Sequence, residues 1–227
     1  MIYNRERQNE IVSEDIILTL CKQEKDFNRY AKMVLFKKNQ NIFTELNSEG
    51  KIYFLVAGTM MMNLSFQEEA QQELILKFLS ENTFFSPDSF KEIDDSIKVK
   101  AKSLTSGACW EINFSFLQKV VRQAGIENEF HSKQLSKFLQ MTLDHLAKST
   151  LSKEARIRSS IAQIGRELGR EDEFGQITLP PEITQPIIAK FSTATREFVA
   201  LTLGRLVDEG ILKVRPKPWI INDINRL

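Results

Sequence analysis

The feature that most constrains this chain is residues 183–212, where two short runs of helical periodicity flank a break of small residues. Thr184 is placed to cap the first helix, and Gly210 follows the second as the usual residue at a helix end. Two short helices joined by a tight turn predict a helix-turn-helix. An αα-hairpin inside a larger helical domain would give the same pattern. The apolar positions are Ile183, Ile187, Ile188 and Phe191 in the first helix and Phe198, Val199, Leu203, Leu206 and Val207 in the second.

The start of the second helix carries Thr195, Arg196 and Glu197, which are candidates for reading DNA bases or adjacent phosphates. In a helix-turn-helix this first turn enters the major groove, and its free backbone N–H groups face phosphates. The arginine fork matches guanine, and a glutamate can accept a hydrogen bond from cytosine. The candidates for contact with the DNA backbone are Thr184, Gln185 and Lys217.

The residues around this motif predict a winged arrangement. Residues 152–169 have an amphipathic pattern that predicts a helix, with Ser149 and Thr150 as hinge and cap before it. A short strand is expected at 176–179. Further on, two strands are expected around residues 215–218, whose two cations would lie where a phosphate backbone passes. A solvated turn is the alternative for that loop.

The sequence pattern differs in residues 31–112, where short apolar runs alternate with polar breaks. Runs rich in aromatic and β-branched residues predict strands, and several at spacings of about ten residues predict a small β-barrel or jelly roll. Gly50 and Gly58 fall where turns belong. Amphipathic helical turns are expected before the strands, within residues 11–30.

A long helix is expected after the strands, within residues 113–151, following a short helix that ends near Gly125. Its apolar positions step alternately by four and three, which is the seven-residue period of a coiled-coil seam. Phe138, Met141 and His145 widen this face and are expected to pack on the strands. Core packing within one chain is the alternative to a dimer. The candidate dimer interface consists of Leu135, Leu139, Thr142 and Leu146.

Net charge and residue content limit the kinds of protein that this chain can be. The net charge is only +1, and residues 151–227 hold 12 Lys and Arg against 10 Asp and Glu, so DNA binding would depend on locally placed cations. The polar N-terminus and the lack of an apolar run of about 20 residues predict a cytoplasmic protein without a membrane span. Two cysteines are too few for a zinc or thiolate iron–sulfur site, and His131 and His145 would lie about 21 Å apart along one helix. No metal site and no catalytic group of residues is therefore expected, and the chain is not expected to be an enzyme.

The motif Thr195-Arg196-Glu197, followed by an apolar helix and by Leu206-Val207-Asp208-Glu209-Gly210-Ile211-Leu212, resembles the DNA-binding unit of the Crp/Fnr transcription regulators. Residues 52–66, two apolar runs with Gly58 at the hairpin between them, resemble the β-roll of that family. The resemblance implies an α+β fold: an N-terminal β-roll (a cyclic-nucleotide-binding-like jelly roll), a long dimerisation helix and a C-terminal winged helix-turn-helix. The domains it implies are residues 1–112 as a helical segment plus β-roll sensor, 113–150 as connecting and dimerisation helices, and 151–227 as the DNA-binding domain.

The resemblance also implies a function: a homodimer that binds a palindromic operator in double-stranded DNA and regulates transcription with RNA polymerase as a partner. Thr193 stands where the family commonly has a turn glycine, and Leu201 where many members have a further arginine, so the Crp target sequence is not expected. The cyclic-nucleotide binders of the family use a Gly-Glu motif and then an Arg that holds the cyclic phosphate. Residues 84–92 lack both, and Glu92 and Asp94 add negative charge. No cAMP binding and no cofactor are expected.

The chain lacks the residues with which the family holds a cyclic nucleotide. In this it resembles the PrfA type of regulator, a divergent branch of the family. Those relatives suggest two alternatives: activity without a ligand, or response to a small-molecule effector such as the thiol glutathione. A third hypothesis is a redox switch between Cys21 and Cys109, and its alternative is a pair of buried, inert thiols. A different function class also stays open, a small-molecule-binding or enzymatic β-barrel with a structural helical C-terminal domain, which would need a convergent polar pocket.

Overall fold

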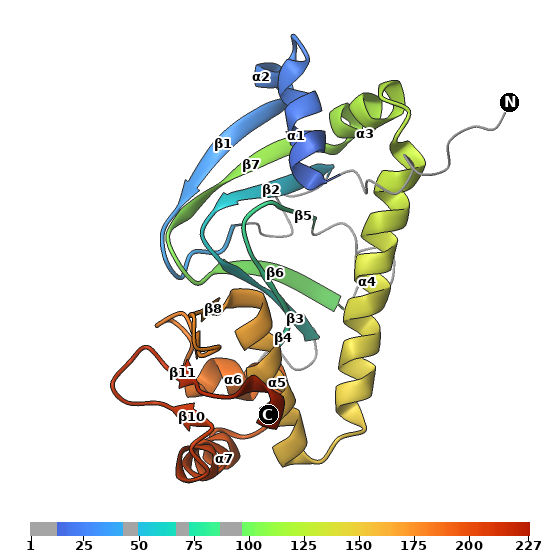
Figure 1. The fold of residues 1–227 in the computed structure, drawn as a ribbon. Coiled ribbons are helices and arrows are strands. Elements are labelled where there is room, and N and C mark those ends of the chain that lie inside the picture. Colours follow the sequence, from blue (N-terminus) through green and yellow to red (C-terminus); the bar gives the residue numbers. More distant parts are fainter. Residues whose placement is uncertain (1–12, 43–49, 67–72, 87–96) are drawn as a thin grey trace, which may run out of the picture.

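The computed structural model describes residues 13–42, 50–66, 73–86 and 97–227 of the chain. Two antiparallel sheets form a β-roll in the N-terminal half, and one long helix runs beside the roll (Figure 1). Helices α5 to α7 and a small sheet gather below the roll, at the C-terminal end of the chain (Figure 1). This order of parts confirms the α+β architecture that the sequence predicts.

The two sheets of the roll enclose an apolar core to which both contribute, with Tyr53 and Leu55 from one and Met60 and Met62 from the other. The strands pair antiparallel within both sheets. The first sheet has the order β1 (Ala31–Phe36), β7 (Gly107–Asn113), β2 (Lys51–Ala57) and β5 (Thr83–Phe85), and the second has the order β4 (Leu74–Leu79), β3 (Met60–Phe66) and β6 (Ile97–Ser103).

Gly58 occupies the turn between β2 and β3 with a φ of 96°, a value that L side chains rarely adopt. A Cβ atom at this position would lie 2.8 Å from the carbonyl oxygen of Ser106. The expected turn is therefore present. The expected hairpin is wrong, because β2 and β3 belong to different sheets and the turn carries the chain from one sheet to the other.

One further strand prediction is wrong, and two strands were not predicted. Residues 41–43 are one of the short apolar runs within residues 31–112 from which strands were expected. They form no strand among the residues described there, since Asn41 makes only an isolated bridge to Lys102 and Phe43 lies outside the described residues. Strand β5 pairs with β2, and β8 (Arg170–Glu171) pairs with β9 (Ile177–Thr178), although neither β5 nor β8 was expected. Both are too short to produce a readable period.

Three helices partly cover the outer face of the first sheet (Figure 1). Two of them precede the strands of the roll in the sequence, and the third follows them. These are α1 (Glu14–Gln23), α2 (Phe27–Tyr30) and α3 (Phe114–Gln123). Ser13 and Asn113 cap α1 and α3 by accepting hydrogen bonds from backbone N–H groups in the first turn. The helical turns expected within 11–30 and the short helix expected before Gly125 are confirmed in the residues described.

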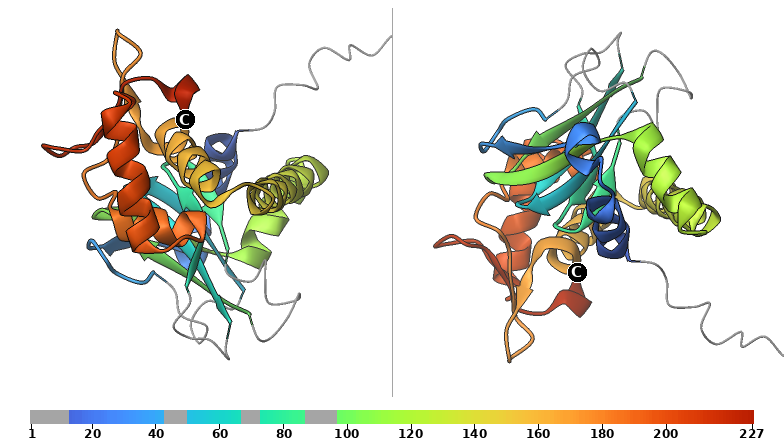
Figure 2. Two further views of the ribbon diagram at one scale, coloured as in Figure 1. Left: turned by 90° about the horizontal axis from the view of Figure 1, so that it is seen from below. Right: turned by 90° about the horizontal axis from the view of Figure 1, so that it is seen from above.

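Helix α4 (Glu127–Ser149) lies along one side of the molecule, with one face towards the roll (Figures 1 and 2). Phe138 and Met141 pack against the core of the roll, and His145 Nε2 lies 2.5 Å from the carbonyl oxygen of Leu76. The expected packing of these three residues on the strands is confirmed. No helix within the described ranges is long and apolar enough to span a membrane.

After α4 the chain turns into α5 (Lys153–Leu168), whose N-terminal cap is Ser152 rather than the expected Ser149 or Thr150. The hydroxyl groups of those two residues instead donate to carbonyl groups in the last turn of α4. The C-terminal part continues with β9, α6 (Gln185–Ser192), α7 (Arg196–Asp208), β10 (Leu212–Lys213), β11 (Ile220–Ile221) and the 3-10 helix η4 (Ile224–Arg226).

The core of the C-terminal part extends into the roll. Buried side chains from α5, α6 and α7 form one cluster with side chains from β3 and β4. This shared core fixes the helix-turn-helix against the second sheet. The residues that the roll contributes are Met61, Ile75, Phe78 and Leu104.

Candidate nucleic-acid interface

Helix α6 begins at the position that the sequence predicts, with Thr184 as its N-terminal cap residue and Pro186 in its first turn. Thr184 thus occupies the expected cap position, but its side chain makes no capping hydrogen bond. Ile188 and Phe191 are fully buried and hold the helix on the shared core. The first turn of α6 thus presents Thr184 and Gln185 to the outside of the motif.

The turn between the two helices is centred on Thr193, which adopts the left-handed conformation with φ 50° and ψ 45°. Its N–H donates to the carbonyl of Ala189, and the next N–H, of Ala194, donates to the same carbonyl at 3.0 Å. This is the geometry for which glycine is usual. A threonine there costs roughly 1–2 kcal/mol, because its Cβ crowds the following carbonyl oxygen.

The start of α7 confirms the helix boundary expected from the sequence. Thr195 is the N-terminal cap, and its hydroxyl oxygen accepts a hydrogen bond from the Phe198 N–H at 3.3 Å. Arg196 and Glu197 occupy the first turn and are exposed. Within the described parts of the chain, the Arg196 guanidinium has no hydrogen bond or ion pair to another residue. The guanidinium is therefore available for a partner outside the chain.

The end of α7 and the following hairpin also match expectation. Gly210 has a φ of 69°, and the next N–H, of Ile211, returns to the carbonyl of Leu206 at 2.9 Å. Strands β10 and β11 pair as Leu212 with Ile221 and Lys213 with Ile220. The loop between these strands forms the wing, which carries exposed cations.

Lys217 fixes the wing to the segment before α6. Its ammonium group donates to the carbonyl oxygens of Pro181 at 2.8 Å and Ile183 at 3.2 Å, and it lies 5.9 Å from the centre of the Trp219 ring. These contacts place Lys217 beside Thr184. The wing and the start of α6 are therefore parts of one surface.

Three of the six predicted DNA-contact residues line one groove of about 460 Å³, which we call the junction groove because it lies between the roll and the helix-turn-helix. Thr195, Gln185 and Glu197 are not among its lining residues and lie at the exposed helix starts. The sequence analysis did not predict the other cations of this groove, which come from the roll and from α6. Lysines alternate along β6, and this pattern could have pointed to Lys102. The groove is lined by Thr184, Arg196 and Lys217 together with Lys38, Lys102 and Lys190.

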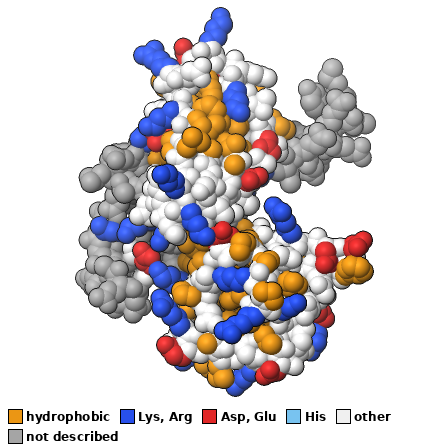
Figure 3. Space-filling model, turned by 90° about the vertical axis from the view of Figure 1, so that its left-hand side faces the viewer, with side chains coloured by type: hydrophobic (Ala, Val, Ile, Leu, Met, Phe, Trp, Pro, Cys, Tyr) orange, Lys and Arg blue, Asp and Glu red, His pale blue; other side chains and the backbone are white. Residues whose placement is uncertain are grey.

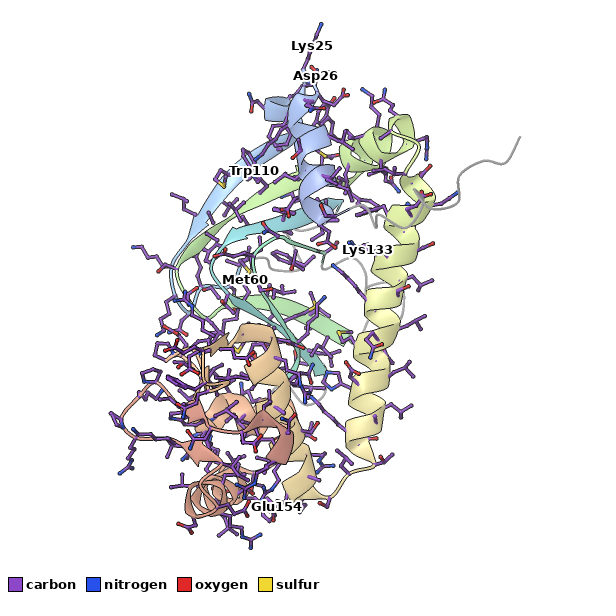
Figure 4. The ribbon with its side chains drawn as sticks, viewed as in Figure 1. Lys25, Asp26, Met60, Trp110, Lys133 and Glu154 are labelled. Carbon is purple, nitrogen blue, oxygen red and sulfur yellow. The ribbon has the colours of Figure 1, made fainter. Side chains whose placement is uncertain are left out.

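Ion pairs hold the far end of α7 to α5, and Glu154 of α5 lies at this end of the molecule (Figure 4). Arg158 donates to both oxygens of Glu209, at 2.7 and 2.9 Å, and also to Glu154, while Arg205 pairs with Glu154. The hydrogen bond from Arg158 lowers the pKa of the Glu154 carboxyl below its usual value, and Arg205 lowers it further. Arg205 is thus engaged within the protein, away from the start of α7.

The outward face of α4 carries a row of exposed leucines. Leu135, Leu139 and Leu146, all predicted for a dimer interface, are 59, 51 and 61% exposed, and Thr142 is also exposed. Leu143, at 57%, belongs to the same row and was missed, although it continues the four-residue step from Leu135 and Leu139. The exposed leucines make this face apolar. No other element of the described chain lies over this side of α4 (Figure 2).

The two cysteines do not meet in this structure. Cys21 lies in the core between the first sheet and its covering helices, and Cys109 lies in the core inside the roll. Burial raises the pKa of each thiol to about 12, with smaller contributions from Glu24 and Glu111 respectively. Both thiols are free and buried in different core clusters. The redox switch between Cys21 and Cys109 stays a prediction.

A second cavity, of about 520 Å³, lies between the roll and α4 and is lined by Lys77, His131 and Lys137 among others. Glu14 reaches its edge, accepting from the Phe84 N–H at 2.6 Å and from Lys137. Burial and the nearby Lys137 lower the pKa of Lys77. The prediction of no cAMP binding rests on residues 84–92. Of these, residues 87–92 lie outside the described residues.

Solved structures with the same architecture include a protein from Listeria monocytogenes EGD-e that contains a cyclic nucleotide-binding domain; it aligns with a TM-score of 0.78 and 22% identity over 94% of this chain and 98% of that one. A mutant of CooA from Carboxydothermus hydrogenoformans aligns with a TM-score of 0.69 and 17% identity over 92% and 93%. A transcriptional regulator of the CRP/FNR family from Thermus thermophilus aligns with a TM-score of 0.63 and 18% identity over 86% and 95%. No protein-family model and no curated protein matches the sequence. The chain has the fold of the CRP/FNR regulators, from the β-roll to the helix-turn-helix.

Proposed function

We propose that this chain is a sequence-specific transcription regulator of the Crp/Fnr family that binds double-stranded DNA and is not an enzyme. The start of α7 carries this proposal, because the exposed, unpaired guanidinium of Arg196 lies in one groove with Thr184 and Lys217. Elements distant in sequence thus present donors on one surface, as a DNA backbone requires. The fold shared with solved regulators supports the same function. Such a regulator acts in the cytoplasm.

In this function α7 enters the major groove by its first turn. Arg196 donates to a guanine and Glu197 accepts from a cytosine, so both residues read sequence. Thr195 fixes the helix start through its bond to the Phe198 N–H. Thr184, Gln185 and Lys217 hold the DNA backbone and set the register of the helix.

The protein acts as a homodimer in this proposal, through the exposed leucine row of α4. Four large apolar side chains on one helix face, each more than half exposed, are expected to be covered by a second copy. A two-fold axis along α4 would place two α7 helices at half-sites about 34 Å apart, which requires a palindromic operator. Rotation of α5 to α7 about residues 149–152 would match or mismatch the half-site spacing, and it requires the core that these helices share with the roll to open.

The proposed regulator does not depend on cAMP, because residues 84–92 carry neither the Gly-Glu pair nor the arginine that hold a cyclic phosphate. RNA polymerase is its expected partner at promoters. A small-molecule effector other than cAMP is compatible with this function.

The test is selection of DNA by the full-length protein. Sheared genomic DNA is passed over the immobilised protein at physiological salt, and the retained fragments are sequenced. We expect a recovered motif with two-fold symmetry and a negative slope of log affinity against log salt concentration. Retention without any common motif, together with a zero salt slope, contradicts the proposal and favours the small-molecule-binding alternative.

A further inference from the structure

Helix α7 buries one face against the shared core and exposes the other. Directly after the first turn of α7, the exposed face carries no side chain that can form a hydrogen bond. Arg205, the next polar residue along this face, is held by Glu154 of α5. The middle of the helix can therefore contact a partner only through apolar surface. The exposed residues concerned are Ala200, Leu201 and Gly204.

Leu201 is the largest of these side chains and is 52% exposed. It follows Glu197 by four residues, so the two side chains share one side of the helix, with Cβ atoms about 5–6 Å apart. Successive bases of a DNA strand are about 3.4 Å apart along the duplex. Leu201 therefore reaches a base one or two steps from the base that Glu197 reads. A single exposed leucine is ordinary on a protein surface, but this one continues the line of proposed base-reading residues.

Gly204 belongs to the same exposed face, three residues after Leu201. A Cβ atom at Gly204 would meet no heavy atom within 4 Å, so packing inside the described chain does not require a glycine there. Glycine is also a poor residue for the interior of a helix. Its use here is explained by a partner outside the chain that passes close to the helix backbone.

The major groove of DNA offers one apolar group at the base edges, the 5-methyl group of thymine. We propose that Leu201 reads a thymine through this methyl group, and that Gly204 leaves the space in which the DNA strand passes close to α7. Hydrophobic side chains lie at the surface among Lys and Arg side chains over the C-terminal part, in the lower half of the view (Figure 3). The inference rests on the proposed function and adds a specificity that Arg196 and Glu197 do not supply, since these two read by hydrogen bonds.

The test removes single methyl groups from the DNA. In the operator selected by the full-length protein, each thymine is replaced in turn, in both half-sites, by deoxyuridine, which keeps the base pair and lacks only the methyl group. Affinity is measured by fluorescence anisotropy at constant salt. We expect one position in each half-site, within two base pairs of the one that Arg196 reads, at which binding weakens about fourfold for each methyl group removed. The other thymines should change the affinity less than twofold.

Variants assign this effect to Leu201. Leu201→Ala is expected to weaken binding of the unmodified operator by a similar factor and to abolish the effect of deoxyuridine. Val207→Ala is the matched control, because it shortens another exposed apolar side chain, 41% exposed, in the last turn of the same helix. This control should keep the full deoxyuridine effect. An operator without a thymine at the expected place, or a deoxyuridine effect that persists in Leu201→Ala, overturns the reading by Leu201.

Gly204→Ala tests the close approach of the strand. Alanine is the better helix former, so the variant is expected to unfold at a higher urea concentration and yet to bind the operator several-fold more weakly. Unchanged affinity in this variant refutes the role of Gly204. A protein that binds no duplex DNA refutes the proposed function, whereas operator binding without any deoxyuridine effect refutes the reading by Leu201 alone.

Discussion

The ammonium group of Lys148 lies 3.9 Å from the centre of the Phe191 ring, and this contact joins the end of α4 to α6 of the helix-turn-helix. The same ammonium donates to Gln163 on α5, and the Phe191 ring lies 5.0 Å from the Phe78 ring on β4. Lys148 is only 9% exposed. One buried lysine therefore links the long helix, the roll and the proposed DNA-binding part.

The pH dependence of stability should report this burial. Burial lowers the pKa of Lys148 to about 8, although Glu167 and Asp144 act in the opposite direction. The unfolded chain holds a proton on this lysine up to about pH 10.5, so stability rises with pH between the two values. We expect the free energy of unfolding of the wild type, minus that of Lys148→Met, to rise by about 3 kcal/mol across that interval in urea denaturation.

Taking the difference removes the contribution of the cysteines. The raised pKa values of Cys21 and Cys109 make the stability of both proteins fall as the pH rises above about 9. This fall is common to the wild type and the variant and cancels. A difference that stays constant from pH 8 upwards would mean that Lys148 titrates as an exposed lysine.

The turn at Thr193 offers a stabilising substitution. Thr193→Gly removes the Cβ that the left-handed conformation crowds, a gain of roughly 1–2 kcal/mol, and adds chain entropy to the unfolded state, a loss of about 0.5–1 kcal/mol. We expect a net gain of about 0.5–1 kcal/mol in urea denaturation. Thr193→Ala is the control, because it keeps the Cβ and loses the hydroxyl bond to the Ser192 carbonyl. An equal gain in both variants would contradict strain at this φ.

Features set by neighbouring residues could be predicted from the sequence, whereas features set by tertiary packing could not. The helix-turn-helix and the packing face of α4 were predictable, because helical period and capping residues such as Thr195 and Gly210 are local properties. The hairpin at Gly58 was wrong because a turn looks the same whether its strands share a sheet or not. The junction groove was not predictable, since it joins Asn63 and Lys102 of the roll to Lys217 of the wing. Only tertiary packing brings such positions together.

The leucine row of α4 yields a prediction about assembly. Leu139→Lys places a charge at the centre of the row and is expected to convert a dimer into a monomer in sedimentation velocity at micromolar concentration. Leu35→Lys is the matched control, since Leu35 is 76% exposed on β1 and lies outside the row. It should leave the sedimentation coefficient unchanged. A monomeric wild type, or dissociation by the Leu35 substitution alone, would contradict a dimer through this face.

The reading role of Arg196 leads to the most specific prediction. Arg196→Ala should cost about 1–3 kcal/mol on the selected operator and relax the preference at one base pair, because a bidentate contact is lost. Lys217→Ala should weaken all sequences equally and lower the salt slope by about 1, as a backbone contact does. Arg29→Ala removes an equal charge from α2, distant from the helix-turn-helix in sequence, and serves as the control in the same anisotropy series. If Arg196→Ala weakens operator and random DNA by the same factor, Arg196 contacts phosphate and another residue of the first turn of α7 reads the base.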